Sequence, residues 1–248
     1  MKKKGLDVTI LEGAVEIVPQ QVVASGAAEF GIAWVPKVLE SREAGADLVN
    51  VAQIFQRSGT LEVSFVDAGI TSIADMAGKR VGTWGFGNEH ELFAALRAQR
   101  RRHGPCCRII FTTESFLAEE GNEDIAIKFI RASIKGWIFC RDNFDECVDI
   151  VLDNGPTLGE GHMRWQLNEI NRLIWPSPDG IGMLDEDLWA QTVAVAIDGS
   201  VISEEPSEGA FRTDLVEAAL ESLAMDDMVD VTGEEWEPMD VEITPGGE

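Results

Sequence analysis

The sequence predicts an α/β protein, because strand-like and helical segments alternate along its first third and helices dominate the remainder. The chain has 248 residues, of which 45% are hydrophobic, enough for a core in one large domain or in two lobes. Short apolar runs typical of buried strands are followed by segments whose apolar residues recur at helical spacing. This alternation favours a largely parallel sheet with helices on its faces.

Each predicted element follows from its local pattern. Residues Leu6 to Leu11 alternate as in a half-buried strand, and other short apolar runs lie between turn residues. The predicted strands are 6–11, 28–34, 48–55, 81–83 and 109–113. Helices are expected where apolar residues form a stripe and where Gly, Asn or Pro ends the pattern. The predicted helices are 14–24, 38–43, one turn within 70–78, 123–139, 146–152, 161–174, 184–197 and 213–223.

The charge of the chain argues against nucleic acid as a partner. Forty-four acidic residues against 20 basic ones give a net charge of -24, which repels phosphate backbones. The last 24 residues hold nine carboxylates and no Lys or Arg. We interpret residues 225–248 as a solvated acidic tail in which Trp236 and Met239 could dock on a surface.

No apolar run is long enough to span a bilayer. The opening Met1 to Lys4 resembles the charged start of a signal peptide, but no apolar stretch follows, so the sequence as written predicts no export signal. Cys140 and Cys147 flank a predicted helix break. A local disulfide and two free buried thiols both remain open for this pair.

A glycine-rich turn is the clearest candidate for a binding site. A short strand ends at Thr83, a turn with two aromatic residues follows, and a helix begins near Glu89. Glycines let a backbone approach a ligand, and the first N–H groups of a helix are free to donate. Trp84 and Phe86 would present ring faces to a flat ligand, with Asn88 or Glu89 bonding its polar edge. The alternative is an ordinary strand-to-helix turn whose aromatic residues fold into the core.

The segment 97–108 differs from its surroundings. It holds five of the chain's 20 basic residues together with Cys106 and Cys107, and it interrupts a helical pattern. One interpretation is a basic loop that binds an anion or an acidic partner. We favour a second, a junction at which sequence has been lost.

Four ordered blocks of sequence resemble the solute-binding proteins of ABC importers, in the family that includes binders of thiamine pyrimidine precursors, riboflavin, sulfonate and nitrate. The blocks are 5–10, 28–33, 73–82 and 111–119. The resemblance implies a type II periplasmic-binding-protein-like fold, in which two lobes close on a ligand. Relative to the family, the chain lacks an opening strand and helix and most of lobe two.

The resemblance also implies a division of the chain and a site. Lobe one would begin with residues 1–65, a shortened lobe two would span 66–110, and residues 111–224 would form a crossover strand and helices that return to lobe one. Trp34 would lie at a strand end of lobe one, although a core role is the stronger alternative, and Ser58 lies between the lobes. The candidate ligand-binding residues are Trp34, Ser58, Thr83, Trp84, Gly85, Phe86, Gly87, Asn88 and Glu89.

The sequence therefore predicts a binding protein and not an enzyme, with no catalytic residue, metal or cofactor. Its partners would be a small aromatic heterocycle and an ABC permease subunit, at the periplasmic or extracellular face of a membrane. The absence of Lys and Arg from 82–91 disfavours an anionic ligand. Two alternatives are a pyrimidine-precursor synthase of the same fold, which would use a cysteine-rich iron motif, and a non-catalytic acidic interaction protein or degenerate fragment.

Overall fold

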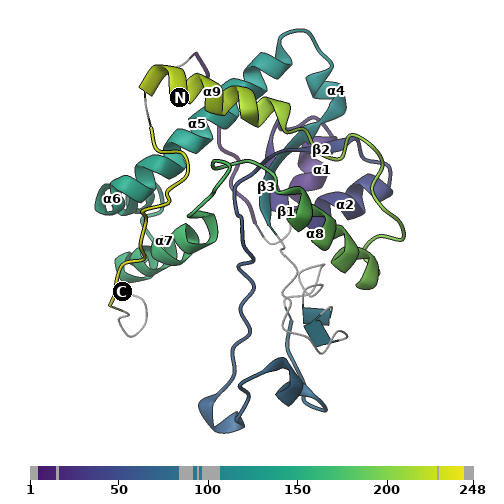
Figure 1. Cartoon of the computed structure of the whole chain (residues 1–248), viewed down its shortest axis with the longest axis vertical. Coiled ribbons are helices and arrows are strands. Elements are labelled where there is room, and N and C mark those ends of the chain that lie inside the picture. The colour runs from purple at the N-terminus through teal and green to yellow at the C-terminus, as the bar shows by residue number, and fades with distance from the viewer. Residues whose placement is uncertain are drawn as a thin grey trace.

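The body of the protein is a small sheet with helices on both faces (Figure 1). The computed structural model describes residues 5–14, 17–83, 92–93, 95–96, 107–227 and 229–242. The strands are β1 (Gly31–Trp34), β2 (Leu48–Gln53) and β3 (Arg108–Thr113). The α/β class predicted from the sequence is confirmed.

The helices of the second half agree with their sequence patterns to within a few residues. The α-helices are α1 (Pro19–Ala24), α2 (Val35–Glu43), α4 (Glu114–Leu117), α5 (Asn122–Asp142), α6 (Phe144–Asn154), α7 (Glu160–Ile174), α8 (Glu186–Asp198) and α9 (Asp214–Asp227). Two 3-10 turns, η2 (Val66–Ala68) and η3 (Ile73–Met76), lie between β2 and β3. The predicted turn of helix within 70–78 is η3.

Two predicted strands are wrong. Residues 6–11 and 81–83 form no strand, and nearly all of their side chains are exposed. A strand is stabilised by hydrogen bonds to a neighbour and by packing of one face. Neither segment has such a neighbour among the described residues, so the alternating pattern alone does not produce a strand.

The prediction of a largely parallel sheet is also wrong. The strand order is β1-β3-β2, and β3 pairs antiparallel with both neighbours. Strands β1 and β2 run parallel to each other and are connected through α2, as the alternation of elements implied. The later strand β3 then inserts between them, and it places Trp34 of β1 directly opposite Arg108.

Two apolar clusters hold the sheet between helices. All six residues of β2 are buried, because helices cover both sides of the sheet. One cluster joins β2 to α5 and α9, and the other joins β1 and β3 to α2 and α8. Helix α5 contributes four buried residues spaced four apart, which lie on one face: Ala126, Ile130, Ile134 and Ile138.

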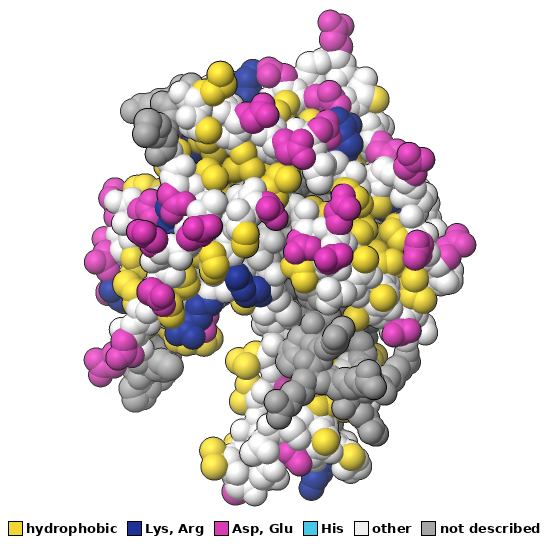
Figure 2. Space-filling view, viewed as in Figure 1, with side chains coloured by type: hydrophobic (Ala, Val, Ile, Leu, Met, Phe, Trp, Pro, Cys, Tyr) yellow, Lys and Arg dark blue, Asp and Glu magenta, His cyan; other side chains and the backbone are white. Residues whose placement is uncertain are grey.

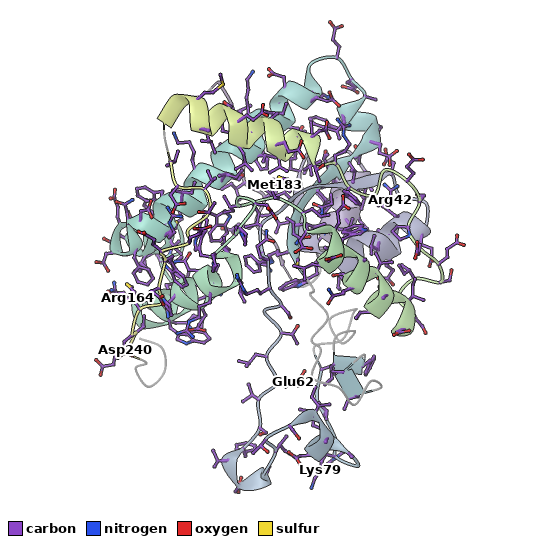
Figure 3. All side chains as sticks on the ribbon, in the orientation of Figure 1. Arg42, Glu62, Lys79, Arg164, Met183 and Asp240 are labelled. Carbon is purple, nitrogen blue, oxygen red and sulfur yellow. A yellow bond between two sulfur atoms is a disulfide. The ribbon has the colours of Figure 1, made fainter. Side chains whose placement is uncertain are left out.

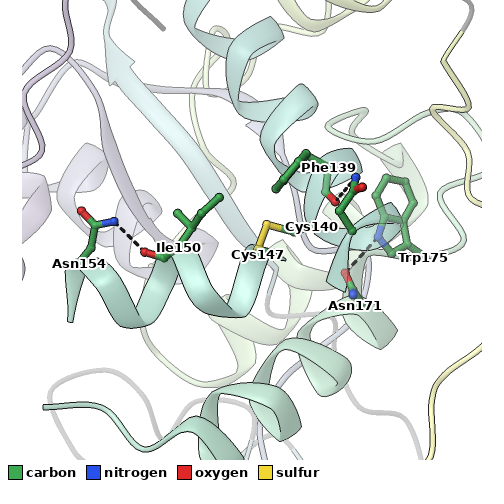
Figure 4. Close-up of a disulfide and its surroundings, with 8 residues drawn as sticks. Phe139, Cys140, Cys147, Ile150, Asn154, Asn171 and Trp175 are labelled. Carbon is green, nitrogen blue, oxygen red and sulfur yellow. Dashed lines mark hydrogen bonds between the residues drawn. A yellow bond between two sulfur atoms is a disulfide. The ribbon is translucent and has the colours of Figure 1, made fainter. Parts of the chain in front are cut away.

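A disulfide joins the end of α5 to the start of α6 (Figure 4). Cys140 and Cys147 are bonded across the break at Asn143, whose side chain donates to the Phe139 carbonyl oxygen at 3.1 Å. The sequence left this pairing open. Cys107 is buried and takes no part in a disulfide among the described cysteines.

The acidic C-terminal segment packs against the body between residues 229 and 242, whereas the sequence suggested a solvated tail. Its backbone accepts from Ser177 N–H and Ile181 N–H, and Asn168 makes two hydrogen bonds to the Met239 backbone. Trp236 packs on the same apolar cluster as α5. The docking of apolar and backbone groups thus outweighs the negative charge of this segment.

Two charged residues and a glycine fix this segment over a buried tryptophan. Arg141 lies 4.5 Å from the ring centroid of Trp175 and forms an ion pair with Asp230 at 3.1 Å. The Asp230 carboxylate accepts from Thr232 N–H and Gly233 N–H at 2.9 and 3.0 Å. Gly233 has φ +61°, and a Cβ there would lie 2.6 Å from the Trp175 ring, so only glycine fits without rearrangement.

Residues 59–83 form an arm that projects from the body (Figure 1), with Glu62 and Lys79 along its length in Figure 3. None of these residues is buried. This described part of the predicted second lobe therefore has no apolar core of its own. No helix among the described residues is both long enough and apolar enough to cross a membrane.

We predict that removing the disulfide lowers stability. In the chain-entropy account, a cross-link that closes so short a loop contributes roughly 2–3 kcal/mol. The double variant Cys140→Ser/Cys147→Ser should therefore unfold roughly 5–10 °C below the parent chain, as measured by calorimetry. Adding reductant should lower the midpoint of the parent to that of the variant and leave the variant unchanged. A parent that is insensitive to reductant would contradict the prediction.

We also predict that Asp230 holds the C-terminal segment in place. The substitution Asp230→Ala removes both turn hydrogen bonds and the Arg141 ion pair. A loss of ~1 kcal/mol in the free energy of docking should accelerate amide exchange in residues 229–242 about fivefold or more. Asp240→Ala is the matched control, because it removes a carboxylate from the same segment without these contacts. Equal exchange in the two variants would rule out this role for Asp230.

This docking should depend on pH. Burial disfavours the ionised Asp230 carboxylate, but the N–H groups of Gly233 and Thr232, the Thr232 hydroxyl and Arg141 outweigh burial and lower the pKa of Asp230 from 3.8. Because the pKa of Asp230 is lower in the folded protein, its ionised carboxylate stabilises the fold at pH values above its ordinary pKa. This stability is lost as the pH falls through the pKa of the folded state. The protection of 229–242, taken relative to intrinsic exchange at each pH, should therefore fall below about pH 4, and Asp230→Ala should lack this fall.

Candidate functional site

The predicted site residues divide into three groups. Residues 84–89, which include Trp84, Phe86 and Glu89, lie outside the described residues. Thr83 is exposed on the arm, and no strand precedes it. Trp34 and Ser58 lie near the junction of the arm with the body.

At this junction an aromatic group forms where β1 and β2 end. Trp34 is the last residue of β1, and its ring is 6.2 Å from that of Phe55, which follows β2. Trp137 of α5 lies 6.4 Å from Phe55 on its other side. Each pair meets edge to face, which is a favourable geometry for aromatic rings. Trp34 and Trp137 are only partly buried, so they contribute to the core and also reach its edge.

Arg108 lies against this aromatic group. Strand pairing places it opposite Trp34, and its guanidinium lies 5.1 Å from the Trp34 ring centroid and 5.9 Å from that of Phe55. The Arg108 carbonyl oxygen also accepts from Ile54 N–H and Phe55 N–H, at 3.1 and 3.2 Å, which fixes the backbone beneath these rings. Within the described part of the chain, no carboxylate pairs with the Arg108 side chain. Arg108 is exposed as a residue, and partial burial of its guanidinium against the two rings lowers its pKa from the ordinary value, so the side chain is held at the rings and is available to a ligand.

The start of the arm completes the site. A Cβ at Gly59 would lie 3.7 Å from the Trp34 ring and 3.0 Å from Leu173, so the arm passes close to both side chains. Arg57 donates to the backbone oxygens of Trp175 and Pro176, beyond the end of α7, at 3.2 and 3.1 Å. A cation at a helix C-terminus is favoured by the helix dipole. Ser58 is half-buried, and its hydroxyl oxygen accepts from Thr60 N–H at 3.1 Å.

Figure 2 shows a hollow between the arm and the α7 side of the body, with Lys and Arg side chains along the edge of the body. The arm leaves the body after β2. This connection lies at the aromatic group, since a Cβ at Gly59 would be 3.7 Å from the Trp34 ring. A ligand at this group would contact the body and the base of the arm together.

The chemistry of this arrangement is recognition. Aromatic faces bind flat rings, and a guanidinium donates to carbonyl, carboxylate or phosphate oxygens. No group of three or more His, Cys, Asp or Glu residues suited to a metal occurs in the described ranges. The side chains at this edge supply fixed donors and ring faces, which are the features of a small-molecule site.

A second concave region lies at the opposite end of α7. It is a groove of about 530 Å³ lined by Glu160, Gly161, Arg164, Met239, Asp240, Val241 and Glu242, with Arg164 and Asp240 labelled in Figure 3. Its arginine pairs with Asp145 at 2.7 Å, and no aromatic residue lines it. The groove is open and mostly acidic, so we place the candidate site at the aromatic group.

Sequence reasoning missed Arg108, Phe55 and Trp137. Arg108 was grouped with the basic segment 97–108, whose other described residue, Cys107, is buried. Phe55 and Trp137 were counted as core residues of a strand and a helix. The three side chains meet Trp34 only because β3 inserts antiparallel between β1 and β2. No local pattern in the sequence reveals the register of this pairing.

Comparison with known proteins gives a match in the first part of the chain. Residues 1–102 match the family model described as NMT1/THI5 like. The matched range includes Trp34, Ser58 and Thr83 and ends before Arg108. No curated protein matches the chain.

Two solved structures are similar to the chain. An ABC transporter protein from Parabacteroides distasonis is 10% identical, with a TM-score of 0.46 over 78% of this chain and 84% of that one. A Candida albicans gene product, described as defining a new family with the generic periplasmic binding protein structural fold, is 12% identical. Its TM-score is 0.46 over 92% of this chain and 85% of that one. The family match therefore covers β1, β2 and most of the arm in sequence, while Arg108 lies beyond it.

Proposed function

We propose that this chain is the ligand-binding component of an ABC-type importer and that it binds a small aromatic heterocycle at the aromatic group. The observation that carries the proposal is Arg108, an exposed residue whose guanidinium lies over Trp34 and Phe55 with no carboxylate partner among the described residues. The match of residues 1–102 to the NMT1/THI5-like model supports the same class of function.

The class of ligand follows from the Arg108 guanidinium, which donates hydrogen bonds, and from the aromatic rings beside it. A pyrimidine precursor of thiamine or a riboflavin-like ring has a flat face for Trp34 and ring oxygens or nitrogens for Arg108. We propose that residues 83–89 contribute Trp84 and Phe86 as further ring faces. No covalent step is needed, because binding and release suffice for delivery to a membrane permease.

The location of the protein would be the periplasm or the outer face of a membrane. The disulfide between Cys140 and Cys147 supports this, because disulfides persist in oxidising compartments. In the binding step the arm would move toward the body about its connection after β2. This connection lies at the aromatic group, so ligand binding and arm position are coupled in this proposal.

A thermal-shift panel tests the function. Hydroxymethylpyrimidine, formylaminopyrimidine, riboflavin, taurine and nitrate are each added to the full chain. A ligand at about 100 times its dissociation constant adds about 2.7 kcal/mol, which should raise the midpoint by roughly 5–11 °C. We expect a shift with a ring compound, and we expect that compound to be recovered unchanged. A cooperative transition that none of the five moves would count against the proposed site, and consumption of the compound would indicate an enzyme.

Substitution of Trp34 tests the site itself. Loss of the ring contact in Trp34→Ala should weaken binding about tenfold, as for ~1.4 kcal/mol, measured by titration calorimetry well below the unfolding midpoint. Trp165→Ala is the matched control, because Trp165 is a partly buried tryptophan of α7 that contacts His162 away from the aromatic group. Equal affinities in the two variants would remove Trp34 from the site.

A further inference from the structure

The arm carries an apolar stretch that nothing covers. Leu61, Val63, Phe65 and Val66 are 73%, 85%, 83% and 99% exposed. The first three alternate with Glu62 and Ser64, so in an extended chain they share one face. Figure 1 shows this part of the arm running as a single extended segment away from the body. Exposed patches of this kind mark interaction sites on soluble proteins.

The backbone at the start of this segment is also unpaired among the described residues, whereas the Phe65 and Val66 carbonyl oxygens accept from Ala68 and Gly69 N–H. Within the described ranges, no hydrogen bond involves the backbone N–H or C=O groups of Leu61, Glu62 or Val63. A strand with free N–H and C=O groups on both edges is a template for pairing with another strand. The arm therefore offers apolar side chains and backbone hydrogen bonds together.

The charge of the arm identifies a suitable partner. The chain as a whole has a net charge of -24, yet residues 59–83 hold two basic and three acidic residues, a net charge of -1. The arm is thus nearly neutral, while the body repels another copy of itself. Two chains that met only through their arms would keep the acidic bodies apart.

We propose that two copies of this chain form a dimer by antiparallel pairing of residues 61–65, with Val63 on the two-fold axis. In this register Leu61 of one protomer lies opposite Phe65 of its partner. Glu62 lies opposite Ser64, so no like charges meet across the pair. The same surface is used on both protomers, as a two-fold interface requires. The dimer is independent of the ligand proposed above.

The available area predicts a weak dimer. Within the paired strand, Leu61, Val63 and Phe65 together present on the order of 500 Å² per chain, within the range of the largest apolar patch on a monomer. Two such strands offer at most about 1,000 Å², below the ~1,200 Å² lower limit of stable interfaces. We therefore expect association in the micromolar range, strengthened by salt because salt screens the repulsion between the acidic bodies.

Sedimentation velocity on the full chain over a micromolar concentration series tests the dimer. We expect a species of about 54 kDa, twice the 27.1 kDa of one chain, whose share rises with concentration and with salt. Val63→Lys should abolish it, because two lysines would face each other across the axis. Val66→Lys is the control, since it adds the same charge at an equally exposed site outside the paired strand, and its dimer should persist.

Cross-linking tests the register. Val63→Cys should form a disulfide-linked dimer under mild oxidation, because residues directly opposite in an antiparallel pair lie within disulfide reach. Leu61→Cys should not, since in this register the two residues 61 lie on the order of 13 Å apart. The parent chain, oxidised in parallel, gives the background from its own cysteines.

Two results would overturn the proposal. A parent chain that sediments as a monomer at every concentration and salt level excludes the dimer, and co-flotation of that monomer with anionic or neutral vesicles would assign the arm to a lipid surface instead. Equal cross-linking of the two cysteine variants would show random collision. Neither result depends on whether the chain binds a heterocycle.

Discussion

The insertion of β3 between β1 and β2 is the constraint on which the rest of the structure depends. Without β3 the two parallel strands have no hydrogen-bonded neighbour in the described sheet. Its pairing satisfies their inner edges and buries Ile109, Ile110 and Phe111 in the two clusters that join the sheet to its helices. The same pairing sets Arg108 opposite Trp34. Core and candidate site therefore depend on a single register.

The C-terminal half stabilises this sheet from one side. The buried stripe of α5 packs under β2, and the disulfide anchors α6 to the end of that helix. Arg141, the neighbour of Cys140, then holds the acidic segment through Asp230 and covers the Trp175 ring. Trp236 adds apolar contact with the same cluster. An acidic tail that would remain solvated on charge alone is thus ordered by one arginine, one tight glycine turn and a few apolar side chains.

The sequence predicted what local patterns determine. The later helices, the strands at 31–34, 48–53 and 108–113 and the turn of helix at 73–76 all follow from apolar periodicity and from the residues that end each element. Prediction from the sequence failed where pairing between segments far apart in the chain determines the structure. Residues 6–11 alternate like a strand and form none for lack of a neighbour, and Arg108 looked like part of a basic loop. Of the candidate site only Trp34 and Ser58 were found from sequence, because Arg108, Phe55 and Trp137 join them only through tertiary contacts.

The arm and the candidate site share one physical origin. The described residues of the arm, 59–83, bury no side chain, whereas Leu92 and Ala95 farther along the chain are buried. The aromatic group at the base of the arm therefore keeps one side open, which a binding site needs. The middle of the arm keeps an apolar face exposed, and pairing with a second chain would remove that face from water. The proposed ligand recognition would use the first consequence and the proposed self-association the second, so the two would occupy different parts of one segment and be separable by substitution.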